Sequence, residues 1–225
     1  MPETTASHEH IIKSYDAELA RLLSEIVRMG QLAGEQLALA AAAVDERNSD
    51  LAMRVVEGDN AIDALEHDVS HDVLRLLALR QPIARDLRDV LAALRIAADI
   101  ERIGDYAANM AKRAIALNQN APMRPAASLP HLAEVAGDML RDVLDAYRRG
   151  DADAAVEVWK RDVQLDTLYT AMFRELLTYM MEDPRNITPC THLLFMAKNI
   201  ERIGDHATPL VEERRKGDHT STLVS

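Results

Sequence analysis

The chain has 225 residues, of which 48% are apolar, and its 37 Asp and Glu against 26 Lys and Arg give a net charge of −11. This length allows one large domain or two small ones, and the acidic balance argues against nucleic acid as a partner, because phosphate backbones require clustered Lys and Arg. No apolar run approaches the roughly 20 residues of a membrane span, and the N-terminal residues lack the basic-then-apolar order of a signal peptide. The single Cys190 excludes an internal disulfide. We therefore expect a soluble, cytoplasmic protein.

The first helix is predicted from a heptad seam. Apolar residues recur at alternating steps of three and four from residue 12 onwards, at Ile12, Tyr15, Leu19, Leu22, Ile26, Met29 and Ala33. This period is typical of a long helix that packs nearly lengthwise against its neighbours. We expect the helix to end near Arg47.

Two further helices are predicted before the middle of the chain. Ser49 or Asp50 is expected to cap the second helix, which runs to about Leu79. Pro82 is expected in the first turn of the third, where its missing N–H costs nothing, and this helix continues to about Asn118.

The segment 120–130 contains three prolines and is the clearest predicted linker. After it the pattern recurs: a fourth helix ends at Arg149, a fifth ends near Glu182, and a sixth begins near Thr188.

The two halves of the chain match each other. Residues 38–63 align without a gap onto residues 141–166 at an offset of 103, and a repeated hexapeptide follows at an offset of 100. A three-residue deletion between the second and third helices of the repeat explains the difference. The sequence therefore predicts an all-α fold of six helices in two pseudo-symmetric antiparallel three-helix bundles. The predicted divisions are a first repeat at 1–119, the linker at 120–130, a second repeat at 131–215 and a flexible polar tail at 216–225.

The repeated hexapeptide, Ile-Glu-Arg-Ile-Gly-Asp, carries two carboxylates four residues apart in each copy. They are Glu101 with Asp105 and Glu201 with Asp205. A spacing of four places both acids of a pair on the same helix face. They are predicted to extend apolar stripes, formed by Leu87, Leu91, Leu94 and Ala98 in the third helix and by Cys190, Leu194 and Ala197 in the sixth.

The alignment of the halves adds a second pair of acidic motifs. Asp59 and Asp63 in the second helix match Asp162 and Asp166 in the fifth. In the fifth helix they interrupt a stripe of large apolar residues: Ala155, Trp159, Tyr169, Phe173 and Leu176. In the second helix a competing apolar face is present, formed by Ile62, Leu65 and Val69.

Each half thus supplies four carboxylates that consecutive antiparallel helices can bring opposite one another. Such groups repel, and burial adds a desolvation cost, so they must be protonated, pair with a cation such as Arg102 or Arg202, or bind a metal ion. Oxygen-only ligands favour Mg²⁺, Mn²⁺, Ca²⁺ or iron over zinc. Gly104 and Gly204 are hypothesised to admit a neighbouring helix beside the acids.

A single pair of this spacing is common on solvated helices. Four copies at symmetry-related positions favour a functional carboxylate site over chance spacing on a solvated surface.

Several motifs together resemble the PhoU family. The resemblance covers about His10 to Glu213 and includes both hexapeptides. Its other marks are Arg54–Asp59, Arg80-Gln81-Pro82 followed by Asp86-Leu87-Arg88, Leu144-Asp145-Ala146 and Tyr179–Asp183.

The resemblance implies two three-helix bundles without catalytic activity, whose acidic motifs can bind multinuclear metal clusters. By position the ligands would be Asp59, Asp63, Glu101, Asp105, Asp162, Asp166, Glu201 and Asp205, and the cofactors divalent or ferric ions (Mg, Mn or Fe). It also implies a negative regulator of phosphate uptake and of the phosphate-starvation response. Such proteins contact the ATPase of the phosphate ABC transporter and a membrane sensor histidine kinase, and dimers are common among them. Pro209 departs from the pattern and is expected to kink or shorten the last helix.

Two alternatives remain open from the residues. One is a metal-free helical adaptor whose acidic clusters receive basic residues of a partner. The other is a carboxylate-bridged di-metal enzyme, for which the nearest motif is Asp68-x-x-His71, without an equivalent in the second half.

Overall fold

The computed structural model describes residues 3–80, 82, 85–149, 151 and 155–218. Within these residues the chain forms six α-helices and no strand. The helices are α1 (Glu3–Asp45), α2 (Ser49–Arg80), α3 (Arg85–Asn118), α4 (Leu129–Arg149), α5 (Ala155–Glu182) and α6 (Ile187–Asp218). Two short 3₁₀ segments, η1 (Arg124–Ser128) and η2 (Pro184–Asn186), precede α4 and α6.

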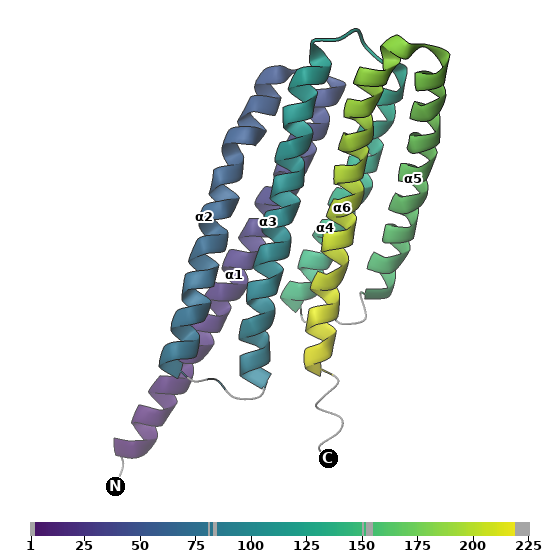
Figure 1. Ribbon diagram of the computed structural model, residues 1–225. Coiled ribbons are helices and arrows are strands. Elements are labelled where there is room, and N and C mark those ends of the chain that lie inside the picture. The colour runs from purple at the N-terminus through teal and green to yellow at the C-terminus, as the bar shows by residue number, and fades with distance from the viewer. Residues whose placement is uncertain (1–2, 81, 83–84, 150, 152–154, 219–225) are drawn as a thin grey trace.

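The six helices form two three-helix bundles that lie side by side, α1 to α3 and α4 to α6 (Figure 1). Consecutive helices within each bundle run antiparallel, because the connections between them are short. The bundles meet where α3 packs against α6 and where α1 packs against α4. This arrangement confirms the predicted all-α, pseudo-symmetric fold.

The seam between α3 and α6 combines apolar packing with polar pairs. His206 Nδ1 lies 2.8 Å from Asp99 Oδ1, and its ring centroid lies 5.6 Å from that of Tyr106. Further along the same seam the guanidinium of Arg113 lies 4.2 Å from the centre of the Phe195 ring. These contacts tie the first half of the chain to the second.

From Leu22 onwards the predicted heptad seam is a buried face of α1, whereas Tyr15 and Leu19 are partly buried and the side chain of Ile12 lies outside the described residues. Leu22, Ile26, Met29 and Ala33 are at most 3% exposed. Burial of such side chains stabilises the fold by about 1.5–3 kcal/mol each for the larger ones. The seam therefore faces the core, as its period of 3.5 predicts.

The turn between α1 and α2 is fixed by Arg47. Its backbone has a positive φ of 53°, a conformation that costs free energy for a residue with a Cβ. Its guanidinium donates to the carbonyl oxygens of Asn118, at 2.7 Å, and of Asn120. Asn118 in turn donates from Nδ2 to Ser49 Oγ at 3.3 Å. This corner therefore holds the C-terminal end of α3 against the start of α2.

Two expected helix starts were wrong. Asn48, rather than Ser49 or Asp50, caps α2, because its Oδ1 accepts hydrogen bonds from the backbone N–H groups of Asp50 (3.1 Å) and Leu51 (3.2 Å). Pro82 lies outside α3, which begins at Arg85, so it does not occupy the first helical turn.

The last helix is not shortened at Pro209, which is one of the two effects expected of this proline. α6 continues through Pro209 to Asp218, so the proline does not shorten it. The predicted tail at 216–225 therefore begins with helical residues, and its remainder lies outside the described residues.

The cap of α2 yields a stability prediction. Asn48→Ala removes the acceptor of two backbone N–H groups and should lower the free energy of unfolding by about 1 kcal/mol. Asn48→Asp keeps the acceptor oxygen, so its free energy of unfolding should stay close to that of the parent protein. Urea titration followed by circular dichroism measures both. An equal decrease in the free energy of unfolding in both variants would contradict a capping role for Asn48.

Candidate functional site

The hexapeptide places its apolar and acidic residues on adjoining faces of one helix. Ile100 and Ile103 in α3 are fully buried, and so are Ile200 and Ile203 in α6. Each Glu follows the first buried Ile by one residue, and one residue corresponds to about 100° of rotation. The acids therefore lie at the margin of the core.

The stripe predicted in α6 is confirmed, since Cys190 and Ala197 are fully buried, but the stripes predicted in α3 and α5 were wrong in part. Leu91 is 38% exposed, and the buried face of α3 runs instead through Val90, Ile96, Ile100 and Ile103. In α5 Trp159 is 61% exposed, while Val158, Leu165, Met172 and Leu176 form the buried face. The acids thus do not interrupt the core stripe but flank it.

In α2 the competing apolar face is the one that the fold buries. Ile62 and Val69 are fully buried, and Asp59 and Asp63 lie beside them. Asp59 is half-buried and Asp63 is exposed. Their counterparts in α5, Asp162 and Asp166, show the same difference.

The glycine of each hexapeptide allows the neighbouring helix to approach the acids, which confirms the hypothesis drawn from the sequence. A Cβ atom at Gly104 would lie 2.9 Å from Ile62 Cδ1 and 3.3 Å from Asp59 Oδ1. A Cβ atom at Gly204 would lie 2.5 Å from Leu165 Cδ2 and 3.4 Å from Asp162 Oδ1. The same glycine thus brings an aspartate of the preceding helix next to each hexapeptide.

Burial and neighbouring negative charges raise the pKa of two acids in the first half, Asp59 and Glu101. Burial, and then the negative charges of Asp63 and Asp105, raise the pKa of Asp59. Burial, and then the charge of Asp105, likewise raise the pKa of Glu101. Asp59 Oδ1 is buried and has no hydrogen-bond partner among the described residues. A buried acceptor without a donor is costly, so this oxygen has capacity for a ligand.

The acids of the second half form a related cluster that contains its own cation. Burial, and then the charges of Asp166, Asp205 and Glu201, raise the pKa of Asp162. Glu201 accepts hydrogen bonds from Lys198 Nζ, which also lies 5.4 Å from the centre of the Tyr169 ring.

Two residues near these clusters did not emerge from the sequence. Glu66 contributes to the raised pKa of Glu101, and its position three residues after Asp63 on the same helix face was the available signal. Lys198 neutralises Glu201, whereas the symmetry-related residue in α3 is Ala98. Of the expected arginine partners, Arg102 forms a long ion pair with Glu101 at 3.9 Å, whereas Arg202 lies 5.8 Å from the Tyr106 ring centre.

The side chains of the two acidic clusters are not already arranged around a common ion position. In the part of the chain that the structure describes, no three His, Cys, Asp or Glu side chains are arranged to hold one ion. The oxygen-only donors and the unpartnered Asp59 oxygen fit a hard cation. Holding one would require the facing carboxylates to turn toward each other.

None of the described helices is long and apolar enough to cross a membrane.

Comparisons with known proteins agree on one family. The model of the PhoU domain matches residues 26–114 and 129–213. A phosphate-specific transport system accessory protein PhoU homolog of Xylella fastidiosa (strain 9a5c) is 59% identical, over 97% of this chain and 98% of its own. The PhoU accessory protein of Serratia marcescens is 37% identical, over 91% of this chain and 84% of its own.

Two solved structures share the fold. The crystal structure of PhoU from Pseudomonas aeruginosa superposes with a TM-score of 0.87 at 36% identity, covering 92% of this chain and 99% of that one. The phosphate transport system regulatory protein PhoU from Streptococcus pneumoniae superposes with a TM-score of 0.84 at 28% identity, covering 94% and 99%.

The raised pKa of Asp59 gives a pH-dependent stability prediction. Because the pKa of this acid is higher in the folded than in the unfolded chain, the folded state holds more protons between the two values. Stability therefore falls as the pH rises through that interval. In metal-free buffer at pH 7, Asp59→Asn should be more stable than the parent by a few tenths of a kcal/mol for each like-charge contact removed.

The difference should vanish in acid below the unfolded pKa of about 4, where Asp59 is protonated in both states. Urea titrations from pH 3 to pH 8 in EDTA measure it, with Glu175→Gln on the exposed side of α5 as the control. Destabilisation of Asp59→Asn at pH 7 would show that the carboxylate is favourably paired.

Proposed function

Because this chain belongs to the PhoU family, we propose that it is an accessory protein of phosphate-specific transport that restrains phosphate uptake and the phosphate-starvation response. The observation that carries this proposal is the match to the PhoU homolog of Xylella fastidiosa, 59% identical over 97% of this chain. The helical architecture that it shares with the Pseudomonas aeruginosa PhoU supports the same conclusion.

We propose that the protein acts in the cytoplasm by contact with other proteins. The partners would be the ATPase of the phosphate ABC transporter and a membrane sensor histidine kinase, and the protein itself would be a homodimer. A net charge of −11 favours basic protein surfaces over nucleic acid or anionic lipid. The role requires no catalytic activity of its own.

We further propose that the two acidic clusters bind divalent or ferric ions. The ligands would be the aspartates of α2 and α5 and the hexapeptide acids of α3 and α6. A bound ion would offset the burial and the mutual repulsion that together raise the pKa of Asp59, Glu101 and Asp162. It would also occupy the unpartnered Asp59 oxygen. An ion in the first cluster would thereby link α2 to α3, and an ion in the second would link α5 to α6.

A metal-free adaptor is the second candidate, and the contact of Lys198 with Glu201 favours it for the second cluster. There the side chain of a lysine contacts a hexapeptide acid, in the way that a basic side chain of a partner would contact the remaining acids. The di-metal enzyme gains no support, because His71 is 72% exposed and its nearest acid, at 3.8 Å, is Asp72.

Deletion of the gene tests the regulatory role. In phosphate-replete medium the deletion strain should express a phosphate-starvation phosphatase reporter several-fold above the parent strain, because its repressing contact is lost. A plasmid copy of the gene should restore repression. Continued repression in the deletion strain would contradict the proposed function, whatever the metal content.

The difference between the clusters predicts unequal metal affinity. With Ala98 in the first half and Lys198 in the second, the first cluster should bind Mn²⁺ more tightly. Lys198 is hydrogen-bonded to its hexapeptide acid, whereas Arg102 lies 3.9 Å from Glu101 and is 62% exposed, so its charge is screened by solvent. Lys198→Ala should tighten the weaker site roughly tenfold, equivalent to about 1.4 kcal/mol. Ala98→Lys should weaken the tighter site by a similar factor.

Isothermal titration calorimetry with Mn²⁺ measures both affinities. Glu101→Ala with Asp105→Ala, and separately Glu201→Ala with Asp205→Ala, assign each to its cluster. Absence of metal from the parent protein after loading would refute metal binding, while the reporter result would stand.

A further inference from the structure

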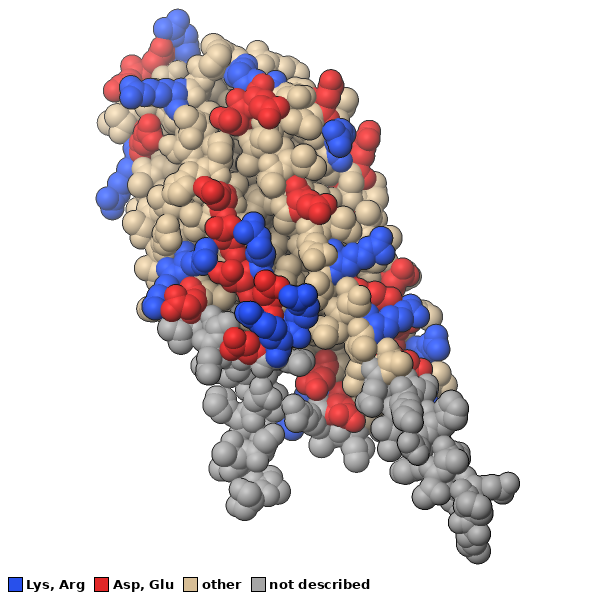
Figure 2. Space-filling view, turned by 180° about the vertical axis from the view of Figure 1, so that it is seen from behind, with Lys and Arg blue, Asp and Glu red and all other residues tan. Residues whose placement is uncertain are grey.

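The first and fourth helices enclose an open groove that the acidic motifs do not use. α1 and α4 lie behind α3 and α6 in Figure 1, and their face is seen in Figure 2, where charged side chains stand in groups separated by uncharged surface. The groove has a volume of about 780 Å³ and extends from Gly30 in α1 to Glu46, the residue that follows this helix. At 1.5 Å per residue this length is about 24 Å, enough for roughly four turns of a bound helix.

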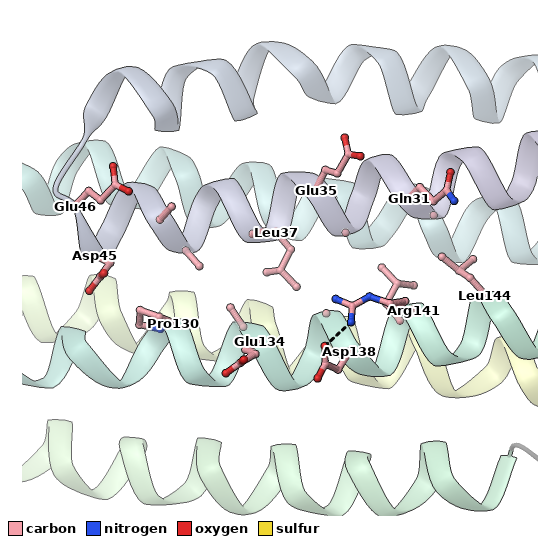
Figure 3. A pocket seen from close by; sticks show the side chains of 18 residues that line it. Gln31, Glu35, Leu37, Asp45, Glu46, Pro130, Glu134, Asp138, Arg141 and Leu144 are labelled. Atoms are coloured by element: carbon pink, nitrogen blue, oxygen red, sulfur yellow. Dashed lines mark hydrogen bonds and ion pairs between the residues drawn. The ribbon is translucent and has the colours of Figure 1, made fainter.

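The floor of the groove is made largely of small side chains. Gly34, Ala38 and Ala41 contribute from α1, and Ala133 and Gly137 from α4. Figure 3 shows Leu37 between the two helices, with the acidic side chains projecting to either side. An apolar floor between two helices is the surface on which a third helix packs closely.

Gly137 has no packing reason to lack a side chain. A Cβ atom there would meet nothing within 4 Å, whereas a Cβ atom at Gly30 would lie 2.5 Å from the methyl groups of Leu144. Glycine inside a helix is destabilising relative to alanine. A glycine that costs stability and faces open space keeps the groove open at its centre.

The rims of the groove are acidic. Its lining includes five carboxylates and one arginine, and one of the carboxylates, Asp138, is already paired with Arg141 at 2.9 Å and with Arg161 at 3.6 Å. The carboxylates come from both helices: Glu35, Asp45, Glu46, Glu134 and Asp138. A ligand that complements this groove is apolar on one side and positively charged on both flanks.

A second copy of the chain would not complement the groove. In a two-fold symmetric dimer the same patch meets itself, so the acidic rims would face each other. The net charge of −11 adds to this repulsion.

We propose that the groove between α1 and α4 docks a basic amphipathic α-helix of a partner protein, with its small apolar side chains on the floor and its Lys or Arg side chains against the two rims. This proposal rests on the proposed function in one respect, that the regulatory contact is with another protein. It adds where that contact lies and what chemistry the partner presents.

The test uses a fluorescent, amidated peptide of about 18 residues, long enough to fill the groove as a helix. It has Ala and Leu along one face and Lys along both flanks. Binding to the full-length protein is measured by anisotropy. The parent protein should bind it, and a peptide with Glu in place of Lys should not bind. Affinity should fall steeply as salt is raised from low to physiological ionic strength, because the rim charges are exposed.

Two variants locate the peptide. Gly137→Leu fills the open space at the centre of the groove, and it should weaken binding at least tenfold without lowering the melting temperature. Glu35→Lys with Glu134→Lys reverses one charge on each rim and should weaken binding to a similar extent. Its control, Glu157→Lys with Glu182→Lys on α5, makes the same charge change outside the groove and should bind normally.

Four results would overturn the proposal. The basic peptide would fail to bind the parent protein, or it would bind Gly137→Leu and the rim variant as tightly as the parent. Alternatively, binding would fall in Asp63→Asn with Asp166→Asn, placing the peptide on the acidic motifs. Light scattering supplies the fourth, because a dimer that Gly137→Leu converts to a monomer would make the groove a self-association face. None of these results depends on the phosphatase reporter, so this inference and the proposed function fail separately.

Discussion

The burial of the hexapeptide isoleucines constrains the rest of this structure. Ile100, Ile103 and their counterparts in α6 are fully buried, and the helical rotation of about 100° per residue then fixes the direction of every neighbour. The following Glu and Asp are forced to the margin of the core, and the glycine lies under the preceding helix. A short sequence thereby specifies packing and acid placement together. A substitution that changes the packing of the isoleucines therefore also moves the acids.

The two halves share one backbone arrangement, as expected from a duplication. Their acidic clusters nevertheless differ in the charged residues beside them. The glycine contacts are nearly equivalent, since Asp59 lies against Gly104 and Asp162 against Gly204. The second half, however, contains Lys198 where the first has Ala98. A fixed cation and a bound cation are two solutions to the same repulsion. We infer that the two clusters are not interchangeable.

The acidic motifs and the groove belong to different helices. The motifs lie on α2, α3, α5 and α6, whereas the groove is formed by α1 and α4. The central pair α3 and α6 contacts both sets, since α3 packs on α1 and α2 and α6 packs on α4 and α5. An ion between α2 and α3 and a helix on α1 and α4 would therefore be coupled only through the core. Close packing transmits such effects as shifts of whole helices.

The sequence by itself determined the six helices, their pairing into two halves and the positions of all eight motif acids. Local information suffices for these, because period and repetition are properties of the chain. It did not determine which face of α3 and α5 is buried, since Leu91 and Trp159 are as apolar as the residues that are buried beside them. Only the tertiary structure decided that, because burial depends on which helix lies opposite. For the same reason the roles of Asn48 and Lys198 and the open space at Gly137 became visible only once the helices were placed together.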